Sequence, residues 1–344
     1  MNVPKHDGHD VAVVLCIYNV RRWLNEAIDS ILTQTLPDFR LIVVDDGSTD
    51  GSGDLVRAYH DARIQLIRQA NQGHDAARNT GSLAADTEFV AYMDADDVSE
   101  RTRLAVQREY LLTHPDVAAV GCSIRIVDQT GRFLFTQHAP TGPARCRRRI
   151  LRGEFYSYGS ALMVRRRAAL DIGLFRTFFR QRGDVDFMLR LAQRYLIDNV
   201  PDVLYRYRMN LQGVSHSDPG PGLYEHRVAY ELMRERLQGG SDRLQRGECI
   251  PPYVAKDRNP PAPHSMQQIL YHLHLSEAQL LREYGHNWSA LRHVLKAWTL
   301  APLSRQTFRR ALTLFMTRPD RSDSDAFDET PPTPVQRYES EGYP

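Results

Sequence analysis

Short apolar runs alternate with helix-like segments through the first hundred residues. The run from 11 to 17 is apolar throughout, which is typical of a strand buried in a parallel sheet, and apolar residues then recur at helical spacing. The same pattern predicts further strands at 41–44, 64–67 and 89–93, and helices near 24–32, 54–59 and 75–85. This alternation predicts an α/β fold with a doubly wound, mostly parallel sheet.

The pattern changes after about residue 100. We expect a helix at 103–112, a strand at 117–127, and an α+β region that includes a helix at 186–195 and a strand at 203–207. From 224 the chain is expected to be mostly helical, apart from a loop near 239–265 that is rich in Gly and Pro. The predicted organisation is a domain at 1–218, a helical extension at 219–318 and a disordered acidic tail at 319–344.

Composition narrows the class of protein. The formal net charge of +2 is nearly balanced, so nothing in it indicates a nucleic-acid partner. Cys16, Cys122, Cys146 and Cys249 form no C-x-x-C pair, so a reducing, cytoplasmic environment is expected. The apolar run at 11–18 is far shorter than the roughly 20 residues that span a bilayer, so we expect no membrane span.

Polar residues follow each predicted strand of the first half. They are Tyr18-Asn19, "DDGSTDGS" at 45–52, "NQGHDAARNTG" at 71–81 and Asp94-Ala95-Asp96. Ligands of doubly wound sheets bind beyond the carboxyl ends of the strands, so these residues predict a cleft there. "DDGSTDGS" by itself is equally typical of a solvated turn.

Several familiar sites are excluded. The stretch from Asp46 resembles the start of an EF-hand loop, but its twelfth position is Arg57 rather than Glu. Neither a G-x-G-x-x-G motif after the first strand nor a P-loop motif occurs. Carboxylates such as Asp94 and Asp96, one residue apart at a strand end, can instead face one Mg²⁺ or Mn²⁺ ion.

Four ordered motifs carry a family resemblance. "VVLCIYN", "VVDDGSTDGS", "NQGHDAARNTG" and "VAYMDADD", between residues 13 and 97, resemble the nucleotide-sugar-binding half of the inverting family 2 glycosyltransferases of the GT-A fold. The resemblance continues more weakly to about residue 215, through "GSALMVRR", "RGDVDFMLRLA" and "YRMNLQGVS". It implies a nucleotide-sugar-binding part at about 9–100 and an acceptor side at 101–218.

The resemblance also implies roles for single residues. Asp45 would bind the uracil, Asp94 would lie on the ribose and metal side, and Asp96 would be the metal ligand. Asp184 would act as the general base on the acceptor hydroxyl. The implied donor-side residues are Tyr18, Asn19, Asp45, Asp46, Asn71, Arg78, Asp94 and Ala95, and those of the acceptor side are Gly183, Asp186 and Arg208.

The sequence departs from the family pattern in three places. Cys16 stands where proline is usual, Gly183 replaces the glutamate that commonly precedes the base, and Asn210 replaces a histidine. The last two changes concern the acceptor side. Asp186 is a second candidate for the base, although its place at a helix start favours capping, and we favour Asp184.

The chemistry fits these parts. Cleavage of a nucleotide sugar leaves negative charge on a diphosphate, which a divalent cation stabilises, and attack from the opposite face needs a separate carboxylate base. We therefore expect an Mn²⁺- or Mg²⁺-dependent, inverting transfer of single sugars from a UDP-sugar to a glycan or lipid-linked acceptor. One alternative is a nucleotidyltransferase, but the Gly-rich loop that is usual in that class is absent from this sequence. The other is an inactive family member that binds a nucleotide sugar or a glycan without turnover.

Two basic segments remain open to interpretation. The stretch 286–318 contains no Asp or Glu and carries aromatic and apolar residues at helical spacing. It predicts either peripheral contact with the inner face of an anionic membrane, or packing on the core or in a homodimer. The arginines around Arg147 fit a solvated surface, a phosphate clamp or a second membrane contact, and a solvated surface is favoured.

Overall fold

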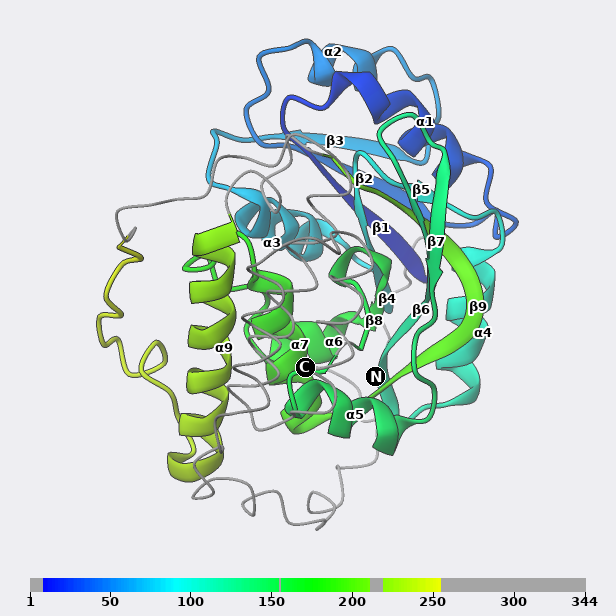
Figure 1. Cartoon of the computed structure of the whole chain (residues 1–344). Helices are drawn as coiled ribbons and strands as arrows, with labels where there is room; N and C mark the ends of the chain where they lie inside the picture. Colours follow the sequence, from blue (N-terminus) through cyan, green and yellow to red (C-terminus); the bar gives the residue numbers. More distant parts are fainter. Residues whose placement is uncertain (1–8, 155, 211–218, 255–344) are drawn as a thin grey trace, which may run out of the picture. The chain divides into compact units, whose positions relative to one another are not determined.

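The computed structural model describes residues 9–154, 156–210 and 219–254 (Figure 1). These residues divide into two compact units. The first contains residues 9–150 and 156–208, and the second contains residues 151–154, 209–210 and 219–254. The basic stretch 286–318 and the acidic tail 319–344 lie outside the described residues, so their predicted structures stay predictions.

The four strands predicted in the first half are confirmed. They are β1 (Val11–Ile17), β2 (Arg40–Asp45), β3 (Ile64–Arg68) and β4 (Phe89–Asp94). They pair in parallel in the order β3-β2-β1-β4, and β1, β2 and β4 are almost entirely buried. Burial on both faces explains why their sequences are continuously apolar rather than alternating.

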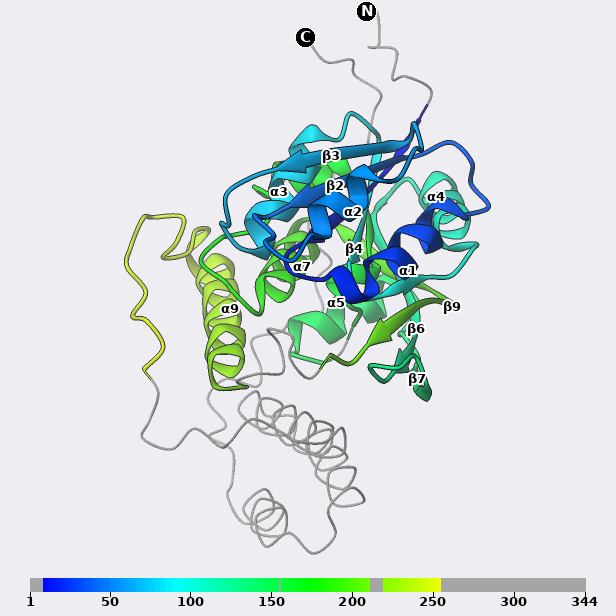
Figure 2. The ribbon, with the colours of Figure 1, turned by 90° about the horizontal axis from the view of Figure 1, so that it is seen from above.

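Helices cover both faces of these strands. α1 (Arg21–Leu32) and α2 (Ser52–Arg57) lie on one face and α3 (His74–Ala84) lies on the other (Figure 2). The arrangement follows from right-handed crossovers, because β1 to β3 step outward whereas the connection through α3 returns to β4 beside β1. A Cβ atom on Gly81 would lie 2.4 Å from Val14 Cγ1, so glycine lets α3 approach β1 closely.

The second half turns the sheet into a mixed one. β8 (Met163–Arg165) pairs antiparallel with both β4 and β6 (Val117–Val127), and β9 (Leu196–Arg208) runs parallel to β6. Two short strands, β5 (Val98–Ser99) and β7 (Phe133–Gln137), pair antiparallel with β9 and β6. The prediction of a mostly parallel sheet therefore describes the first four strands, and β9 begins at Leu196 rather than at 203.

Helices of the second half are α4 (Arg103–Thr113), α5 (Pro143–Leu151), α6 (Arg166–Asp171) and α7 (Gly183–Arg194), with a 3-10 turn, η1, at Gly159–Ala161. α7 begins at Gly183, earlier than the predicted 186. The arginine-rich stretch forms α5, which the sequence did not predict. Its Cys146 and Ile150 are buried while Arg145 and Arg148 are exposed, so the basic face is solvated.

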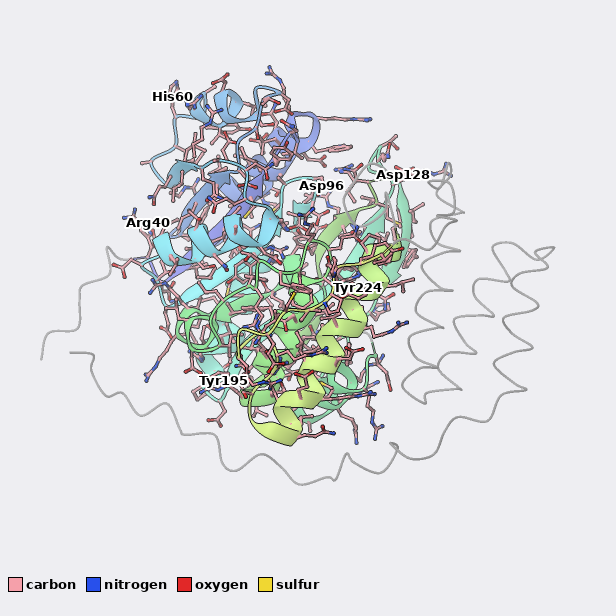
Figure 3. All side chains as sticks on the ribbon, turned by 90° about the vertical axis from the view of Figure 1, so that its left-hand side faces the viewer. Arg40, His60, Asp96, Asp128, Tyr195 and Tyr224 are labelled. Atoms are coloured by element: carbon pink, nitrogen blue, oxygen red, sulfur yellow. The ribbon has the colours of Figure 1, made fainter. Side chains whose placement is uncertain are left out.

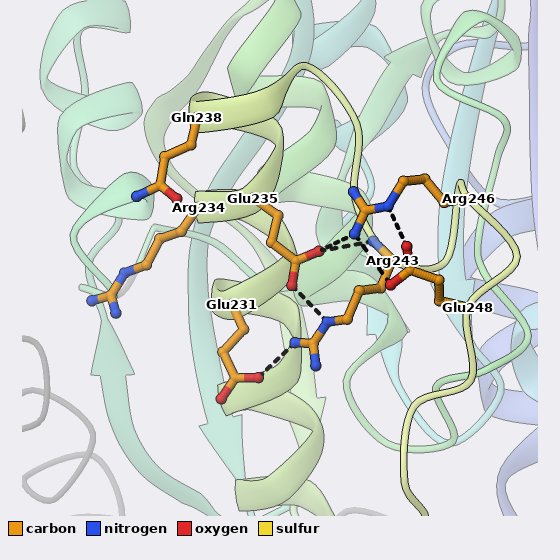
Figure 4. Close-up of a pocket in the computed structure, with 7 residues that line it drawn as sticks. All are labelled: Glu231, Arg234, Glu235, Gln238, Arg243, Arg246 and Glu248. Carbon is orange, nitrogen blue, oxygen red and sulfur yellow. Dashed lines mark hydrogen bonds and ion pairs between the residues drawn. The ribbon is translucent and has the colours of Figure 1, made fainter.

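The second unit consists mainly of α9 (Pro219–Gly239) and the irregular segment after it. Ion pairs link the two around a charged hollow (Figure 4). Arg243 Nη2 lies 2.8 Å from Glu231 Oε2, and Arg243 Nε lies 2.6 Å from Glu235 Oε1. Within the described part of the chain, no helix has the length and apolar character needed to cross a bilayer.

Candidate active site

The polar strand ends of the first unit meet at one edge of the sheet. The register places Asp94 of β4 opposite Cys16 of β1, and Asp45 of β2 opposite Ile17 of the same strand. The loop that follows β3 and the start of α3 reach the same edge, since Asp46 binds the backbone N–H groups of Gln72 and Gly73. The structure thus brings together the segments that the motifs had marked.

Arg78 on α3 is the central cation of this edge. Its side chain is buried, its Nη2 donates a hydrogen bond of 2.9 Å to Asp94 Oδ1, and its Nη1 lies 3.7 Å from Asp75 Oδ1. Burial lowers the pKa of the guanidinium, but the carboxylates of Asp94, Asp75 and Asp184 together raise this pKa above its usual value. Arg78 thus interacts with Asp75 of its own helix and with carboxylates from β4 and α7, which are distant in the sequence.

Asp94 is held as a carboxylate. Burial raises its pKa, but Arg78 and the ring of His74, whose Nε2 lies 3.2 Å from Asp94 Oδ1, hold the pKa of Asp94 well below its usual range. Its backbone N–H also donates to the hydroxyl of Tyr205 at 3.2 Å. Asp94 is thus charged and fixed in position at neutral pH.

The turn after Asp94 is held from β9. Arg208 donates its backbone N–H to Asp97 Oδ1 and its Nε to the carbonyl oxygen of Asp96, both at 2.8 Å. Its Nη2 donates to Glu26 Oε2 of α1 at 2.6 Å. Arg208 was expected on the acceptor side, and the structure places it at the turn, where it fixes the direction of Asp96 (labelled in Figure 3).

Asp97 completes the same turn from the inside. Its side chain is buried, and burial together with the charges of Asp96 and Asp94 raises its pKa well above the usual value. Asp96 is partly exposed, so of the two it is the residue that solvent and a ligand can reach. The family resemblance implied Asp96 as the metal ligand and gave Asp97 no role.

The two acids after β2 face different partners. Asp45 Oδ1 accepts the Ser48 N–H at 2.8 Å, while its buried Oδ2 makes no hydrogen bond within the described residues and lies 3.6 Å from Arg68 Nε. Asp46 accepts the N–H groups of Gln72 and Gly73 at 2.9 and 2.8 Å. Asp46 therefore anchors the loop before α3, and Asp45 retains an oxygen for a ligand donor.

Three of the remaining donor-side residues lie at the rim, and the fourth is buried. Tyr18 is 52% exposed, and Asn71 is exposed as well. Asn19 adopts a left-handed φ of 49°, which asparagine tolerates well, and its Oδ1 accepts the Thr49 N–H at 2.8 Å. Ala95 is buried within the acidic turn.

The two candidate bases on α7 have different surroundings. Asp186 is fully buried; its Oδ2 accepts a hydrogen bond of 2.8 Å from Arg190 Nε, and its Oδ1 lies 3.6 Å from Arg176 Nη1. It pairs with cations of the core and caps no helix. Asp184, two residues closer to the helix start, is partly exposed, and its Oδ1 accepts the N–H of Val185 at 2.9 Å. Of the two, Asp184 is accessible to a substrate.

The acidic turn was tested as a metal site by its donor set. No group of three or more His, Cys, Asp or Glu side chains gathers as a metal site in residues 9–154, 156–210 and 219–254. Mg²⁺ commonly uses only one or two carboxylates, with water and substrate phosphates filling its remaining positions. Asp96 and the neighbouring Asp94 therefore fit an ion that arrives with a diphosphate, rather than a resident structural ion.

Sequence reasoning missed Asp75, Tyr205 and Asp97 as members of this site. Asp75 lies within the quoted motif "NQGHDAARNTG", and its position on the first turn of α3 was a signal that could have been used. Tyr205 and Asp97 gave no local signal, because their contacts join residues that are more than one hundred positions apart in the chain.

Comparison with known proteins agrees with this geometry. Residues 12–173 match the sequence model described as "Glycosyl transferase family 2". The putative glycosyltransferase EpsE of Bacillus subtilis (strain 168) is 30% identical over 214 residues, which cover 59% of this chain and 74% of EpsE. The chain belongs to glycosyltransferase family 2.

Other relatives of this family member are matched over less of their length. Glycosyltransferase GlyA of Streptococcus pneumoniae is 35% identical over 127 residues, which are 36% of this chain and 18% of GlyA. Two further relatives are covered to 26% and 42% of their own length, so the chain spans less than half of these proteins.

Solved structures support the GT-A-like fold. Residues 1–349 of Staphylococcus aureus TarS, in complex with UDP-GlcNAc, align with a TM-score of 0.56 at 16% identity, covering 89% of each chain. The mannosyltransferase PcManGT from Pyrobaculum calidifontis, in complex with GDP-Man and Mn²⁺, aligns with a TM-score of 0.53 at 20% identity, over 89% of this chain and 84% of that one. The predicted fold class is thus confirmed.

Proposed function

We propose that the protein transfers a single sugar from a nucleoside-diphosphate sugar, with uridine as the favoured base, to a hydroxyl of a glycan or lipid-linked acceptor. The observation that carries the proposal is the arrangement around the buried Arg78. Asp94 and Asp75 lie 2.9 and 3.7 Å from its guanidinium, and Asp184 directly follows Gly183, where a Cβ atom would lie 1.6 Å from Asp75 Oδ2. It joins a cationic centre, suited to a diphosphate, to an accessible carboxylate suited to a base. The neighbouring structures contain UDP-GlcNAc and GDP-Man, which supports this class of donor.

The donor side would bind the nucleotide through polar groups at the strand ends. Asp45 Oδ2, which accepts no hydrogen bond within the described residues, fits the N–H of a uracil ring, and Tyr18 and Asn19 lie on the neighbouring loop. Arg78 would lie beside the diphosphate, with Asp94 holding its guanidinium in place. Asp96 would hold an Mg²⁺ or Mn²⁺ ion, which when bound supplies positive charge that stabilises the leaving diphosphate.

The transfer step needs one base and one displacement. The acceptor oxygen forms a bond to the anomeric carbon while the bond from that carbon to the diphosphate oxygen breaks, and the electron pair leaves with the diphosphate. The hydroxyl proton passes to the carboxylate of Asp184. Attack from the face opposite the leaving group inverts the anomeric configuration, and Asp186 takes no part because Arg190 and Arg176 pair with it in the core.

A thermal-shift panel tests the donor. UDP, GDP, dTDP and CMP are each added with Mn²⁺, with Mg²⁺ or with EDTA, because a ligand that binds the native state raises the melting temperature. We expect stabilisation by UDP that EDTA removes and that Asp96→Ala abolishes without unfolding the protein. Stabilisation by GDP instead of UDP would mean that the donor carries guanosine rather than uridine. No shift with any nucleotide would overturn the proposal, and an unaltered anomeric configuration in the product would overturn inversion.

A further inference from the structure

Asp75 is a carboxylate of the site that the proposed reaction does not yet use. It lies on the first turn of α3, and its side chain is 9% exposed. It forms an ion pair with Arg78, whose Nη1 lies 3.7 Å from Asp75 Oδ1. Neither Asp75 oxygen makes a hydrogen bond within the described residues. A largely buried carboxylate without a hydrogen-bond donor is free to accept one from a ligand.

The Asp75 carboxylate fills the space of a side chain at position 183. A Cβ atom built on Gly183 would lie 1.6 Å from Asp75 Oδ2 and 2.5 Å from its Cγ. The φ angle of Gly183 is not in the left-handed region, so the backbone does not require glycine there. Glycine at the start of α7 leaves free the volume that the carboxylate of Asp75 occupies.

A second glycine makes the same kind of room for Asp184. A Cβ atom on Gly159 of η1 would lie 2.5 Å from Asp184 Cβ and 3.0 Å from its Oδ2, and the φ angle of Gly159 is also outside the left-handed region. The two glycines thus let two carboxylates stand next to each other at the beginning of α7. One comes from α7 itself and the other from α3.

This pairing costs stability. Burial is the largest cause that raises the pKa of Asp75, to about 6, and the charges of Asp184 and Asp186 act in the same direction, whereas Arg78 and His74 oppose them. Carboxylates that are kept close at a cost are characteristic of sites where a ligand binds. A purely structural partner for Arg78 would need neither the burial nor the neighbouring Asp184.

We propose that Asp75 is a second carboxylate of the acceptor site, which supplies from α3 the side chain that Gly183 lacks, and that it accepts a hydrogen bond from the acceptor. The inference rests on the proposed function. While Asp184 takes the proton of the attacking hydroxyl, Asp75 binds the hydroxyl on the adjacent carbon. The acceptor class is therefore a compound with two neighbouring hydroxyls, as on a sugar ring, and not an isolated alcohol.

Small alcohols that differ by one hydroxyl test this role. Purified full-length protein, with its donor and Mn²⁺, is given 1,2-propanediol or 1-propanol, and glycosylated product is measured for each. We expect the wild type to prefer the diol by about 10- to 100-fold, the range for one hydrogen bond to a charged group. Asp75→Ala should abolish this preference. Because the preference is the ratio of diol product to propanol product for one and the same variant, a general loss of activity does not change it. Equal use of both alcohols by the wild type, or transfer to water alone, would overturn the inference.

Moving the carboxylate provides the matched control. Gly183→Asp places a Cβ atom 1.6 Å from Asp75 Oδ2, so by itself it should lower both melting temperature and transfer. In the double variant Asp75→Ala/Gly183→Asp the space is free, and both the stability and the preference for the diol should return. A folded double variant without the preference would show that Asp75 acts only on Arg78. If the wild type turns over no donor, the proposed function fails. If the melting-temperature changes of Asp75→Ala and Gly183→Asp simply add in the double variant, the two side chains do not share one position.

Discussion

Arg78 Nη2 lies 2.9 Å from Asp94 Oδ1, which ties helix α3 to the end of strand β4. The guanidinium also lies over the ring of Phe175, 5.1 Å from its centroid, so an aromatic side chain packs against it as well. A buried arginine of this kind holds the donor side in one arrangement before any ligand arrives. Its removal should therefore affect folding and donor binding together.

Arg78→Met should lower the free energy of unfolding by about 3 kcal/mol, because Asp94 loses its partner in a largely buried ion pair. Urea unfolding monitored by circular dichroism measures the change. Donor binding should be lost even at temperatures where the variant remains folded. Arg57→Met removes an arginine from an exposed pair with Asp54 and is the control, with little change expected.

The stability of the wild type should fall steeply in acid because of Asp94. The pKa of Asp94 is lowered in the folded state, so its contribution is fully present above the unfolded pKa of about 3.9 and is lost as the pH falls toward the folded value. Unfolding free energies measured from pH 5 to pH 2 should show this loss. The slope should be smaller in Arg78→Met, and equal slopes would mean that Arg78 does not set the pKa.

For Asp75 we expect stability to change with pH in the opposite direction, and at a higher pH. Its folded pKa of about 6 lies above the unfolded value, so the folded state binds the extra proton between about pH 4 and pH 6, and stability falls as the pH rises through this range. Asp75→Asn removes the contribution and should be more stable than the wild type at pH 7 by roughly 2–3 kcal/mol. A variant less stable than the wild type at pH 7 would contradict this account of Asp75.

Asp184→Asn and Asp186→Asn form a matched pair on α7. Loss of the base should reduce turnover by about 10²- to 10⁴-fold in Asp184→Asn, with the melting temperature nearly unchanged. Asp186→Asn should instead lower stability by roughly 3–5 kcal/mol, because Arg190 and Arg176 lose their buried partner. Its turnover per folded molecule should exceed that of Asp184→Asn, and the reverse order would assign the base to Asp186.

Arg208→Ala should loosen the acidic turn. Asp97 would keep its backbone hydrogen bond, but the carbonyl of Asp96 and the carboxylate of Glu26 would lose their donors. We expect a loss of about 1–3 kcal/mol in unfolding free energy. The substitution should also reduce nucleotide affinity more in the presence of Mn²⁺ than in its absence. Calorimetric titration of UDP with and without the metal separates the two effects.

Local pattern was sufficient for the first half of the fold. The strands β1, β2 and β4 are buried on both faces, so their apolar runs are continuous, and polar residues begin where each strand leaves the sheet. The order of the motifs then fixed which strand ends would meet. Each of these features depends on residues that are close together in the sequence, which is why a single sequence was enough to predict them.

The second half depended on contacts that are distant in sequence. β8 is three residues long and takes its place between β4 and β6 only because both neighbours offer backbone groups. The sequence did not predict α5 because the arginines of this helix outnumber its three buried side chains, Cys146, Ile150 and Leu151. Pairing between distant segments leaves no local signal, so these elements required the tertiary structure.

The sequence by itself determined the family and the residue types of the site. Only the tertiary structure decided which carboxylates could act there: Asp186 is fully buried against Arg190, Asp97 faces inward, and Asp96 and Asp184 remain accessible. It also brought Asp75 into the space left by Gly183, across more than one hundred residues of chain. The physical reason is that the charge and accessibility of a carboxylate depend on the groups packed around it, and packing is a property of the whole fold.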